Sequence, residues 1–486
     1  MLFPSVLFIL YFLPAVLALY WAFSFSPSAQ NVCLLVLSLA FYAWGEPWFL
    51  VPMLFLIIVN HVIGLKLDGA QLPAYRRKVV TLAVVLNAAT LLLVRYGTTV
   101  AGAVADLLGA DLQLPELAPP LGVAFFTLQA LAYVFDIRRG KAPPERNIVN
   151  TGLYIAFFPT VLAGPILRFA DMAAQLRTRC MTLELFGQGC ERFIVGLAKL
   201  TVLAAPLGRM ADGIFARSAA GVQFYNTPAL LAWLALLAYG LQVYMNLSGY
   251  SDLAIGLARM FGFSVKENFR HPYMAHTVGE FWNRWHISLF RWFYVYVFLV
   301  LGGSRARLVH FRGALRPRNF VLRNLFIMWL LIGLWHGISL NHLFFGLWFF
   351  IFALFEWLVS LRRRNTGNPL WHIYLLCVVA ISLIFLRCAS LGETMRFFSN
   401  LLGVNGNGFS SDLAMTLARE NWSALSLGVL FSTPIGQKIL EALRGGNSAG
   451  FVGTLRGIGY VATLAGVFFV ALVYLSRAGT ILPGFC

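Results

Sequence analysis

Long uncharged runs recur along the chain and define its pattern of hydrophobic and polar positions. Residues 1–45 contain no charged side chain, and a second set of uncharged runs lies at residues 147–167, 218–251, 324–355, 365–386 and 457–476. Each run reaches the ~20 apolar residues that a helix needs to cross a bilayer. Shorter apolar stretches lie near residues 47–65, 79–94, 119–135, 193–208, 287–301 and 421–436. The pattern predicts an all-α polytopic membrane protein with roughly 11 to 13 membrane helices, some of them re-entrant.

Composition agrees with lipid as the solvent. Hydrophobic residues make up 59% of the 486 positions and charged residues only 12%, whereas charged residues approach about a quarter of a soluble domain. The sequence has no repeat of solenoid period, and its loops are too short for a second soluble domain. We therefore expect a single membrane domain over residues 1–486.

The formal net charge of +18 does not indicate nucleic acid as a partner. The basic residues lie in short loops between apolar runs, as expected for loops on the cytoplasmic side. Residues 96–137 contain Asp106, Asp111, Glu116 and Asp136 but no Lys or Arg, and the only charged residue in 401–417 is Asp412, so we place both stretches outside. Arginine outnumbers lysine, a bias common in high-GC bacteria, which favours a bacterial inner membrane.

A polar cluster interrupts the apolar sequence near residue 250. Its members are Gln242, Tyr244, Asn246, Ser248, Tyr250, Ser251 and Asp252. Such a cluster either lines a wet or ligand-binding region or forms a buried hydrogen-bonded network between helices, and both interpretations stay open. Gly249, followed by Asp252, predicts a break in the helix at this point.

Aromatic and polar residues alternate in the segment Glu280-Phe-Trp-Asn-Arg-Trp-His286-Ile-Ser288. At helical spacing, Asn283 and His286 would share one face. A helix of this kind is most often an interfacial element, so a purely structural role is the alternative to a functional one.

His336 is the sharpest candidate for chemistry. It follows Trp335 in the segment Gly333-Leu-Trp-His336-Gly337, inside the uncharged run at residues 324–355. An ionisable group among apolar residues is a functional hypothesis by default, and histidine can take and return a proton near neutral pH. A structural histidine that donates to a neighbouring carbonyl is the alternative. Metal-binding and nucleotide-binding motifs are absent from the sequence, so we expect neither a metal site nor nucleotide hydrolysis.

Several motifs follow one another in a fixed order. They are Phe158-Pro159, Ala163-Gly-Pro-Ile-Leu-Arg168, Ser248-Gly-Tyr-Ser-Asp252, Glu267-Asn268-Phe, Phe281-Trp-Asn-Arg-Trp-His286, Leu301-Gly-Gly-Ser-Arg305 and Gly333-Leu-Trp-His336-Gly. This series resembles the membrane-bound O-acyltransferase family, in particular its bacterial branch. The resemblance covers most of the chain, is dense between about residues 154 and 346, and becomes vague after about residue 390. It implies N-terminal helices in 1–150, a catalytic core in 151–360 and C-terminal helices in 361–486.

The resemblance also implies a fold and a reaction. Membrane helices would form a ring around a thin central region, with a passage between the two faces. The invariant histidine of the family corresponds to His336, a second functional histidine to His286, and a polar group of residues to Tyr250, Ser251, Asp252 and Asn268. The acyl donor would be a cytoplasmic thioester, acetyl-CoA here, with no permanently bound cofactor.

From this resemblance we expect His336 to deprotonate an acceptor hydroxyl, while Asn268 or His286 stabilises the oxyanion. Arg284 and arginines of residues 305–323 would hold the donor phosphates, and Asn283 and Trp335 complete the candidate substrate contacts. The expected function is acetyl transfer to an extracytoplasmic acceptor, for O-acetylation of an exported polysaccharide such as alginate. Partners would be extracytoplasmic acyltransferase or acyl-carrier proteins and membrane lipid. The alternatives are D-alanyl transfer to teichoic acid and a non-enzymatic glycan or lipid transporter.

The sequence departs from the family pattern in two places. Phe293-Tyr-Val-Tyr296 stands where relatives usually have an Arg-Asp-Tyr step, and the terminus Gly479-Thr-Ile-Leu-Pro-Gly-Phe-Cys486 lacks an aromatic tail. The first departure concerns the donor contacts and the second the partner or acceptor.

Overall fold

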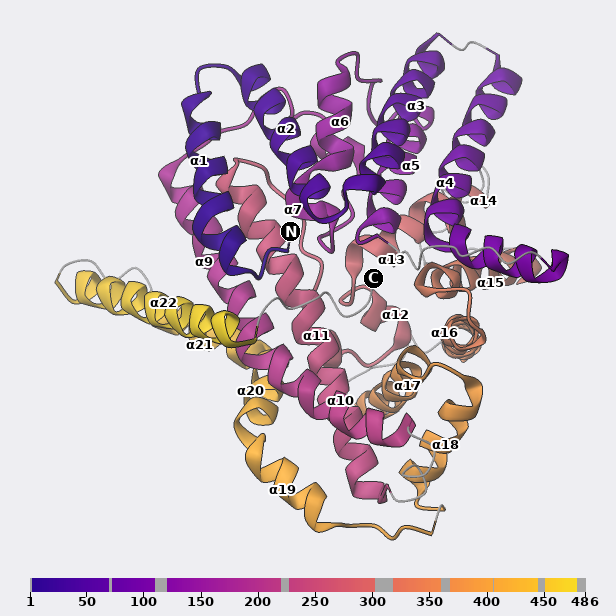
Figure 1. Cartoon of the computed structure of the whole chain (residues 1–486), viewed down its shortest axis with the longest axis vertical. Helices are drawn as coiled ribbons and strands as arrows, with labels where there is room; N and C mark the ends of the chain where they lie inside the picture. The colour runs from indigo at the N-terminus through magenta and orange to yellow at the C-terminus, as the bar shows by residue number, and fades with distance from the viewer. Residues whose placement is uncertain are drawn as a thin grey trace. The chain divides into compact units, whose positions relative to one another are not determined.

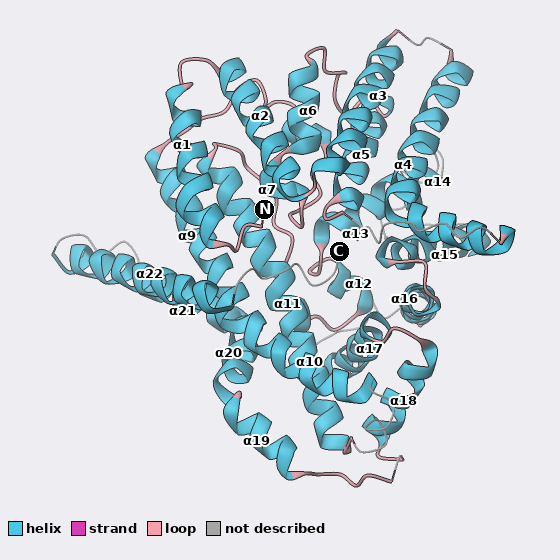
Figure 2. Cartoon of the chain, viewed as in Figure 1, coloured by secondary structure: helices cyan, strands magenta, loops and turns pink. Residues whose placement is uncertain are grey.

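The described part of the chain is built from helices. The computed structural model describes residues 2–69, 72–109, 120–219, 227–301, 318–359, 368–404, 406–444 and 451–478. Every regular element in these ranges is helical (Figure 2). Lipid offers no hydrogen-bond partner to backbone N–H and C=O groups, and a helix pairs these groups with one another within a single segment. The all-α fold predicted from the uncharged runs is confirmed.

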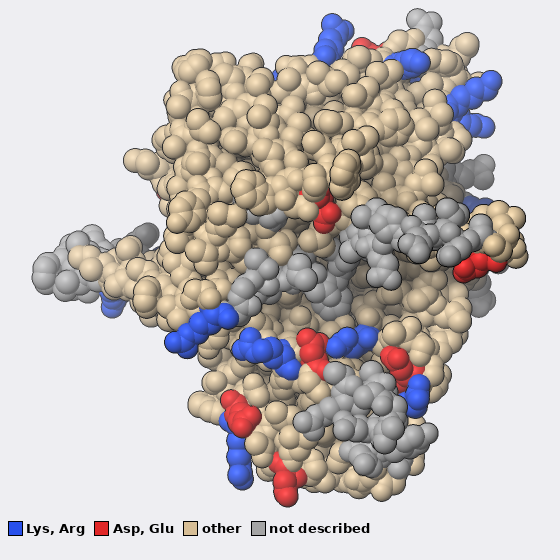
Figure 3. Space-filling model, viewed as in Figure 1, with Lys and Arg blue, Asp and Glu red and all other residues tan. Residues whose placement is uncertain are grey.

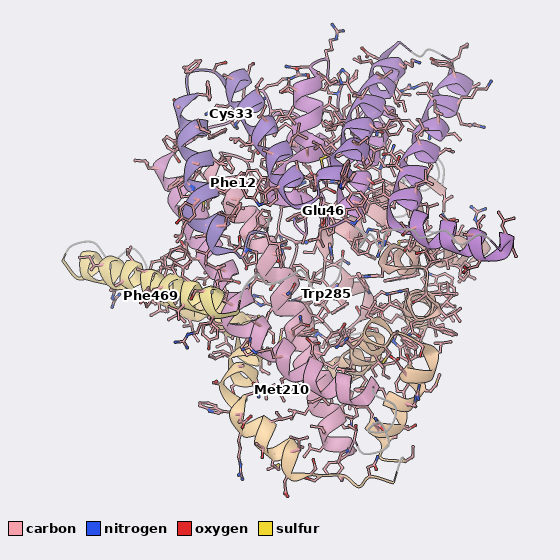
Figure 4. The ribbon with its side chains drawn as sticks, viewed as in Figure 1. Phe12, Cys33, Glu46, Met210, Trp285 and Phe469 are labelled. Atoms are coloured by element: carbon pink, nitrogen blue, oxygen red, sulfur yellow. The ribbon has the colours of Figure 1, made fainter. Side chains whose placement is uncertain are left out.

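Eight helices of the described chain are long and apolar enough to cross a membrane, and five shorter apolar helices accompany them. The spans are Pro27–Gly45, Pro47–Asp68, Pro73–Leu108, Leu183–Phe215, Ala229–Met260, Leu340–Leu358, Pro369–Arg387 and Arg456–Arg477. Their outer faces are apolar: Phe469, labelled in Figure 4, is 66% exposed. On the face drawn in Figure 3, the surface over the first two α-helices carries almost no charged side chain. The protein is a multi-pass membrane protein.

The described residues group into two compact units, each taken here by itself. Unit 1 comprises the residues up to Phe193 and Leu253–Lys266, and unit 2 comprises Ile194–Asp252 and the residues from Glu267 onward. The expectation of a single domain with divisions at 150 and 360 stays a prediction.

Unit 1 contains the N-terminal helices (Figure 1). They are η1 (Phe8–Phe12), α1 (Leu13–Ala22), α2 (Pro27–Gly45), η2 (Pro47–Phe49), α3 (Leu50–Asp68), α4 (Pro73–Leu108), α5 (Val123–Arg138), α6 (Ile148–Ala156), α7 (Phe158–Val161), α8 (Phe169–Met172) and most of α9 (Leu183–Ala198). Sequence signals set several starts: Ser26 caps α2 by accepting from the amide of Ala29 at 3.4 Å, with proline at the next position.

Aromatic rings fill much of the interior of unit 1. Phe3 stacks on Phe41 with ring centroids 5.3 Å apart, and Phe41 lies 5.4 Å from Phe158. Phe8 and Phe12 pack against the same rings. Because Phe158 belongs to one of the recognised motifs, at least part of that motif's role is packing.

Unit 2 contains the remaining elements, and α11 and α9 each contribute residues to both units. They are η3 (Lys199–Ala204), α10 (Ala205–Ala219), α11 (Ala229–Met260), η5 (Pro272–Met274), α12 (Val278–Trp282), α13 (Ile287–Phe293), η6 (Tyr294–Phe298), α14 (Leu299–Leu301), α15 (Arg318–His336), α16 (Leu340–Leu358), α17 (Pro369–Arg387), α18 (Leu391–Leu402), α19 (Asp412–Glu420), α20 (Trp422–Ser432), α21 (Pro434–Arg444) and α22 (Phe451–Ala478).

The helix break predicted near Gly249 is wrong. α11 runs without interruption through Gly249 and Asp252. Gly249 has another role: a Cβ there would lie 2.9 Å from Leu200 and 3.0 Å from the carbonyl oxygen of Gly196. The glycine lets two helices approach closely, which is the use of small residues typical of membrane helices.

The uncharged run at residues 324–355 forms two helices joined by a tight turn. α15 ends at His336 and α16 begins at Leu340. The two helices cross at Gly333 and Gly346, whose Cα atoms are near enough that a Cβ on Gly333 would lie 3.3 Å from the Cα of Gly346 and 2.5 Å from the carbonyl oxygen of His342. This crossing fixes the geometry of the turn.

Replacing Gly333 with alanine tests the importance of that crossing. The added methyl group cannot fit without separating the helices, so we expect Gly333→Ala to lower the free energy of unfolding by about 1 to 3 kcal/mol. The measurement is unfolding of the purified protein in detergent. Gly466→Ala in α22 is the matched control, because nothing lies within 4 Å of the new Cβ. Equal unfolding midpoints for both variants would contradict the assignment.

Candidate active site

His336 lies at the turn of the α15–α16 hairpin. It is the last residue of α15, and Gly337 and Ile338 lead to Ser339, the N-cap of α16. The imidazole is half-buried. A helix end provides carbonyl groups without intrahelical partners, and a protonated imidazole interacts favourably with them. His336 is thus at a helix terminus, although the uncharged run placed it within a single apolar span.

Aromatic rings surround the imidazole of His336. Its ring centroid lies 4.9 Å from that of Trp335 and 5.0 Å from that of Phe345, both edge-on. His342 lies parallel to it at 6.4 Å, and the Nδ1 atom of His342 is 2.7 Å from the hydroxyl of Ser339. A Cβ at Gly337 would lie 2.6 Å from Nδ1 of His342, so a larger residue there would force the His342 ring to shift. His342 is therefore a neighbour of the proposed catalytic ring.

His286 occupies a turn between two short helices. α12 ends at Trp282 and α13 begins at Ile287, and His286 has a φ of 39°, in the left-handed region. A left-handed residue other than glycine costs about 1 to 3 kcal/mol, and such strain clusters at functional sites. The side chain is buried and lies outside the eight candidate spans. Burial lowers the pKa of His286 to about 4, so the imidazole is neutral at physiological pH.

The predicted common face of Asn283 and His286 is wrong, because the left-handed turn interrupts the helix. Asn283 is exposed and donates to the carbonyl oxygen of Gly279 at 2.6 Å. Arg284 donates to the carboxylate of Glu280 at 2.7 Å, and this contact is an ion pair within the segment itself. Of the arginines proposed to hold phosphates, those of residues 305–317 lie outside the described residues.

Trp335 links the two candidate histidines. Its ring is edge-on to that of His286, with centroids 6.0 Å apart. It is also edge-on to the ring of His336, the next residue in the sequence, with centroids 4.9 Å apart. Phe269 also approaches His286, at 5.9 Å. The structure thus brings His286, Trp335 and His336 together, although fifty positions separate the two histidines. Trp285, labelled in Figure 4, precedes His286 and packs against Tyr244 of α11.

Asn268 connects the polar cluster of α11 to the turn at His286. Its side-chain amide nitrogen donates to the hydroxyl of Ser251 at 3.1 Å, and its side-chain oxygen accepts from the amide of Ser288 at 2.9 Å. Tyr250, the neighbour of Ser251, is fully buried. The polar cluster therefore includes the hydrogen-bonded network that was one of its two interpretations.

Asp252 forms a buried ion pair that sequence reasoning missed. Its carboxylate lies 2.6 Å from the ammonium of Lys199, with side-chain exposures of 6% and 18%. Lys199 begins η3, a π-helical segment within the span Leu183–Phe215, and π-helical segments are frequent at functional sites. A signal existed in the sequence, since Lys199 is a lone cation inside the apolar stretch at residues 193–208.

Glu356 is a second buried carboxylate with a positioning role. It accepts from the amides of Val278 at 2.5 Å and Gly279 at 3.3 Å, at the start of α12. Tyr374 donates to the same carboxylate at 3.4 Å. A carboxylate at a helix N-terminus neutralises its free amides. Glu356 of α16 thereby fixes the start of the segment that leads to His286.

The ionisable groups of the described residues do not gather as metal ligands: no cluster of three or more His, Cys, Asp and Glu side chains occurs there. What the site offers is a half-buried imidazole, a buried neutral imidazole and polar groups that hold the latter in place. Such a set suits proton transfer and oxyanion stabilisation in acyl transfer. Fold and site together define a polytopic α-helical membrane protein with a histidine-based centre.

The chain belongs to the membrane-bound O-acyltransferase family, whose pattern it matches over residues 36–391. It is 32% identical over 437 residues to the probable alginate O-acetylase AlgI of Pseudomonas aeruginosa, and the match covers 88% of this chain and 79% of the relative. It is 27% identical to the peptidoglycan O-acetyltransferase of Helicobacter pylori, over 89% and 86% of the two chains. The teichoic acid D-alanyltransferase of Bacillus subtilis matches 47% of this chain at 24% identity, and 56% of its own.

The family membership predicted from the ordered motifs is confirmed, and the protein is an O-acyltransferase. The alternative of a non-enzymatic transporter is thereby set aside.

Removing one partner of the Lys199–Asp252 pair tests its contribution to stability. Asp252→Leu leaves the partly buried ammonium of Lys199, which is 18% exposed, without its ion-pair partner, so we expect a loss of about 3 kcal/mol in the free energy of unfolding, the lower end of the range for a buried pair. The double variant Lys199→Met/Asp252→Leu has no unpaired charge and should recover most of that loss. Unfolding in detergent measures both.

The exposed pair Arg387–Asp212, with side-chain exposures of 31% and 69%, supplies the control. Asp212→Ala should cost less than about 1 kcal/mol, because water screens an exposed pair. A double variant as unstable as Asp252→Leu would show that the ion pair does not account for the loss.

Proposed function

We propose that this O-acyltransferase passes an acetyl group from a cytoplasmic thioester, acetyl-CoA, to a hydroxyl group outside the bacterial inner membrane. The observation that carries the proposal is the group of His286, Trp335 and His336, in which two imidazoles of different exposure contact one indole. Similarity over 88% of the chain to a probable alginate O-acetylase supports a polysaccharide as the acceptor.

In this reaction His336 acts as the general base. Its imidazole accepts the proton of the acceptor hydroxyl while the oxygen attacks the thioester carbonyl carbon. The tetrahedral intermediate then collapses and the carbon–sulfur bond breaks. The departing sulfur takes the proton from His336 and leaves as a thiol. The products are an acetyl ester and free coenzyme A, and His336 returns to its neutral form.

His286 serves as a hydrogen-bond donor to the developing oxyanion. A neutral imidazole carries one N–H, and a donor fixed before the reaction stabilises the transition state by about 2.7 to 4 kcal/mol. The turn that holds His286 is buried, which strengthens such an interaction because water is excluded. The resemblance names Asn268 as the other candidate donor, but its side-chain amide already donates to Ser251 at 3.1 Å.

The position of the basic loops supports the direction of transfer. Clusters such as Arg76, Arg77 and Lys78, and Arg138, Arg139 and Lys141, are typical of cytoplasmic loops. Acetyl-CoA would therefore bind from the cytoplasm, and the acetyl group would leave on the other side. Extracytoplasmic acyltransferase or acyl-carrier proteins of a polysaccharide-modification system would be the partners of the enzyme on that side.

D-alanyl transfer to teichoic acid is the second candidate. Its bacterial relative matches only 47% of this chain, compared with 88% for the probable alginate O-acetylase. The difference favours acetyl as the transferred group and a polysaccharide as the acceptor.

The test is transfer of labelled acetyl from acetyl-CoA into extracellular polymer by cells that carry His336→Ala or His286→Ala. Loss of a general base lowers the rate by about 10² to 10⁴-fold, and loss of one oxyanion donor by about 10² to 10³-fold. The abundance of each variant in the membrane is measured in the same cells, because lost folding would also abolish labelling.

His61→Ala is the matched control. His61 is a buried histidine of unit 1 whose Nδ1 atom lies 3.0 Å from the hydroxyl of Thr151, and its loss should leave labelling per molecule nearly unchanged. Normal labelling by His336→Ala would refute the base assignment. Labelling by D-alanine in place of acetate would select the second candidate.

A further inference from the structure

Asn268 holds the backbone on the C-terminal side of His286. Its main-chain carbonyl oxygen accepts from the amide of Ile287 at 2.9 Å, and its side-chain oxygen accepts from the amide of Ser288 at 2.9 Å. These are the first two amides of α13, which have no acceptor within their own helix. His286 is the N-cap of α13, but its side chain makes no capping hydrogen bond. Asn268 caps the helix in its place.

A second main-chain hydrogen bond holds the other side of the turn. The amide of Arg270 donates to the carbonyl oxygen of Arg284 at 2.9 Å. Together with the bonds from Asn268, this bond fastens residues 284–288 to residues 268–270 on both sides of His286. The strained left-handed conformation of His286 persists because its flanking groups are fixed.

The side chain of Asn268 is itself held from α11. Its amide nitrogen donates to Ser251 at 3.1 Å, and Asn268 is 1% exposed. Ser251 precedes Asp252, whose pairing with Lys199 ties this part of α11 to η3. A rigid helix therefore fixes the asparagine, and the asparagine fixes the turn.

We infer that Asn268 is a positioning residue of the acyl-transfer site, which acts by accepting the amides of Ile287 and Ser288 and so sets the direction of the His286 imidazole. This role differs from donation of a hydrogen bond to the reacting oxyanion. The inference rests on the proposed function for its kinetic part, while its structural part is independent of it.

The positioning role and the oxyanion-donor role predict opposite orders of activity for the variants Asn268→Asp and Asn268→Leu. Asn268→Asp keeps a side-chain oxygen that accepts from Ser288, whereas Asn268→Leu has a similar size and no acceptor. A positioning role predicts that Asp retains more activity than Leu. A donor to the oxyanion predicts that Asp is the worse of the two, because it has no N–H and adds negative charge.

The kinetic measurement uses membranes that contain the full chain with its natural partners. Initial rates of label transfer are recorded over a range of acetyl-CoA concentrations and divided by the amount of protein. We expect Asn268→Leu to lower kcat by about 100-fold with the KM for acetyl-CoA changed less than threefold, because misplacing a reacting group by about 1 Å has this effect. Asn268→Asp should remain within about tenfold of the natural kcat.

Hydrogen exchange supplies a readout that does not need activity. In Asn268→Leu the amides of residues 286–290 should exchange at least tenfold faster, while peptides from α16 stay unchanged. The matched control is Asn87, a fully buried asparagine of unit 1 that donates to Asn60 at 2.9 Å. Asn87→Leu and Asn87→Asp should change neither exchange at 286–290 nor kcat per folded molecule by more than about threefold.

Two results would overturn the inference: Asn268→Asp less active than Asn268→Leu at equal abundance, or Asn268→Leu inactive with unchanged exchange at residues 286–290. If Asn268→Asp does not accumulate, the exchange measurement on Asn268→Leu decides alone. Failure of the natural protein to transfer acetyl from acetyl-CoA would refute the proposed function, and faster exchange would still support the positioning of the turn.

Discussion

Main-chain hydrogen bonds between residues 268–270 and 284–288 are the interactions on which the candidate site depends. Backbone that leaves a helix in an apolar interior has to find new partners for its amides and carbonyls. Here two such segments satisfy each other, through Arg270 with Arg284 and Asn268 with Ile287. Because they do so, a buried histidine can stand in a conformation that neither a helix nor an isolated turn would favour.

The rest of unit 2 supports these two segments from three directions. Glu356 of α16 binds the first amides of α12, and Ser251 of α11 binds the side chain of Asn268. Trp335, at the end of α15, packs edge-on against His286. The closeness of α15 and α16 at Gly333 and Gly346 determines where that tryptophan and His336 lie. Packing between helices therefore controls the geometry of the chemical groups.

Sequence patterns predicted the helical class and the membrane spans, because lipid restricts an apolar chain to helices and charge gaps mark where they lie. They also identified His286, His336 and the polar residues near 250 as candidates. They did not predict the turn at His286, because an argument from helical spacing assumes a continuous helix. They also did not predict the hairpin at Gly337, because an uncharged run can form either one membrane span or two helices joined by a turn. The role of Gly249 was misjudged for a related reason: the sequence does not distinguish a glycine that breaks a helix from one that lets a neighbouring helix approach.

The segment that departs from the family pattern has its own structural solution. Tyr294–Phe298 forms η6, a π-helical stretch, in which Tyr294 stacks on Phe298 with centroids 5.3 Å apart. Asn324 of α15, which is 1% exposed, donates to the carbonyl oxygen of Phe298 at 3.1 Å. Aromatic packing and one buried amide thus hold this segment, and the amide anchors α15, which ends at His336, to η6.

The two histidines have unequal environments, which suit the different roles proposed for them. Burial of His286 favours its neutral form, which suits a group that donates one hydrogen bond and never takes up a proton during the reaction. His336 is half-buried at a helix C-terminus, where the carbonyl ends favour a positive charge. A general base becomes positive when it accepts the proton of the attacking hydroxyl, so that environment lowers the energy of the intermediate state. Under the proposed mechanism, the placement of His336 at the end of α15 would stabilise the charge that forms and is released during the reaction.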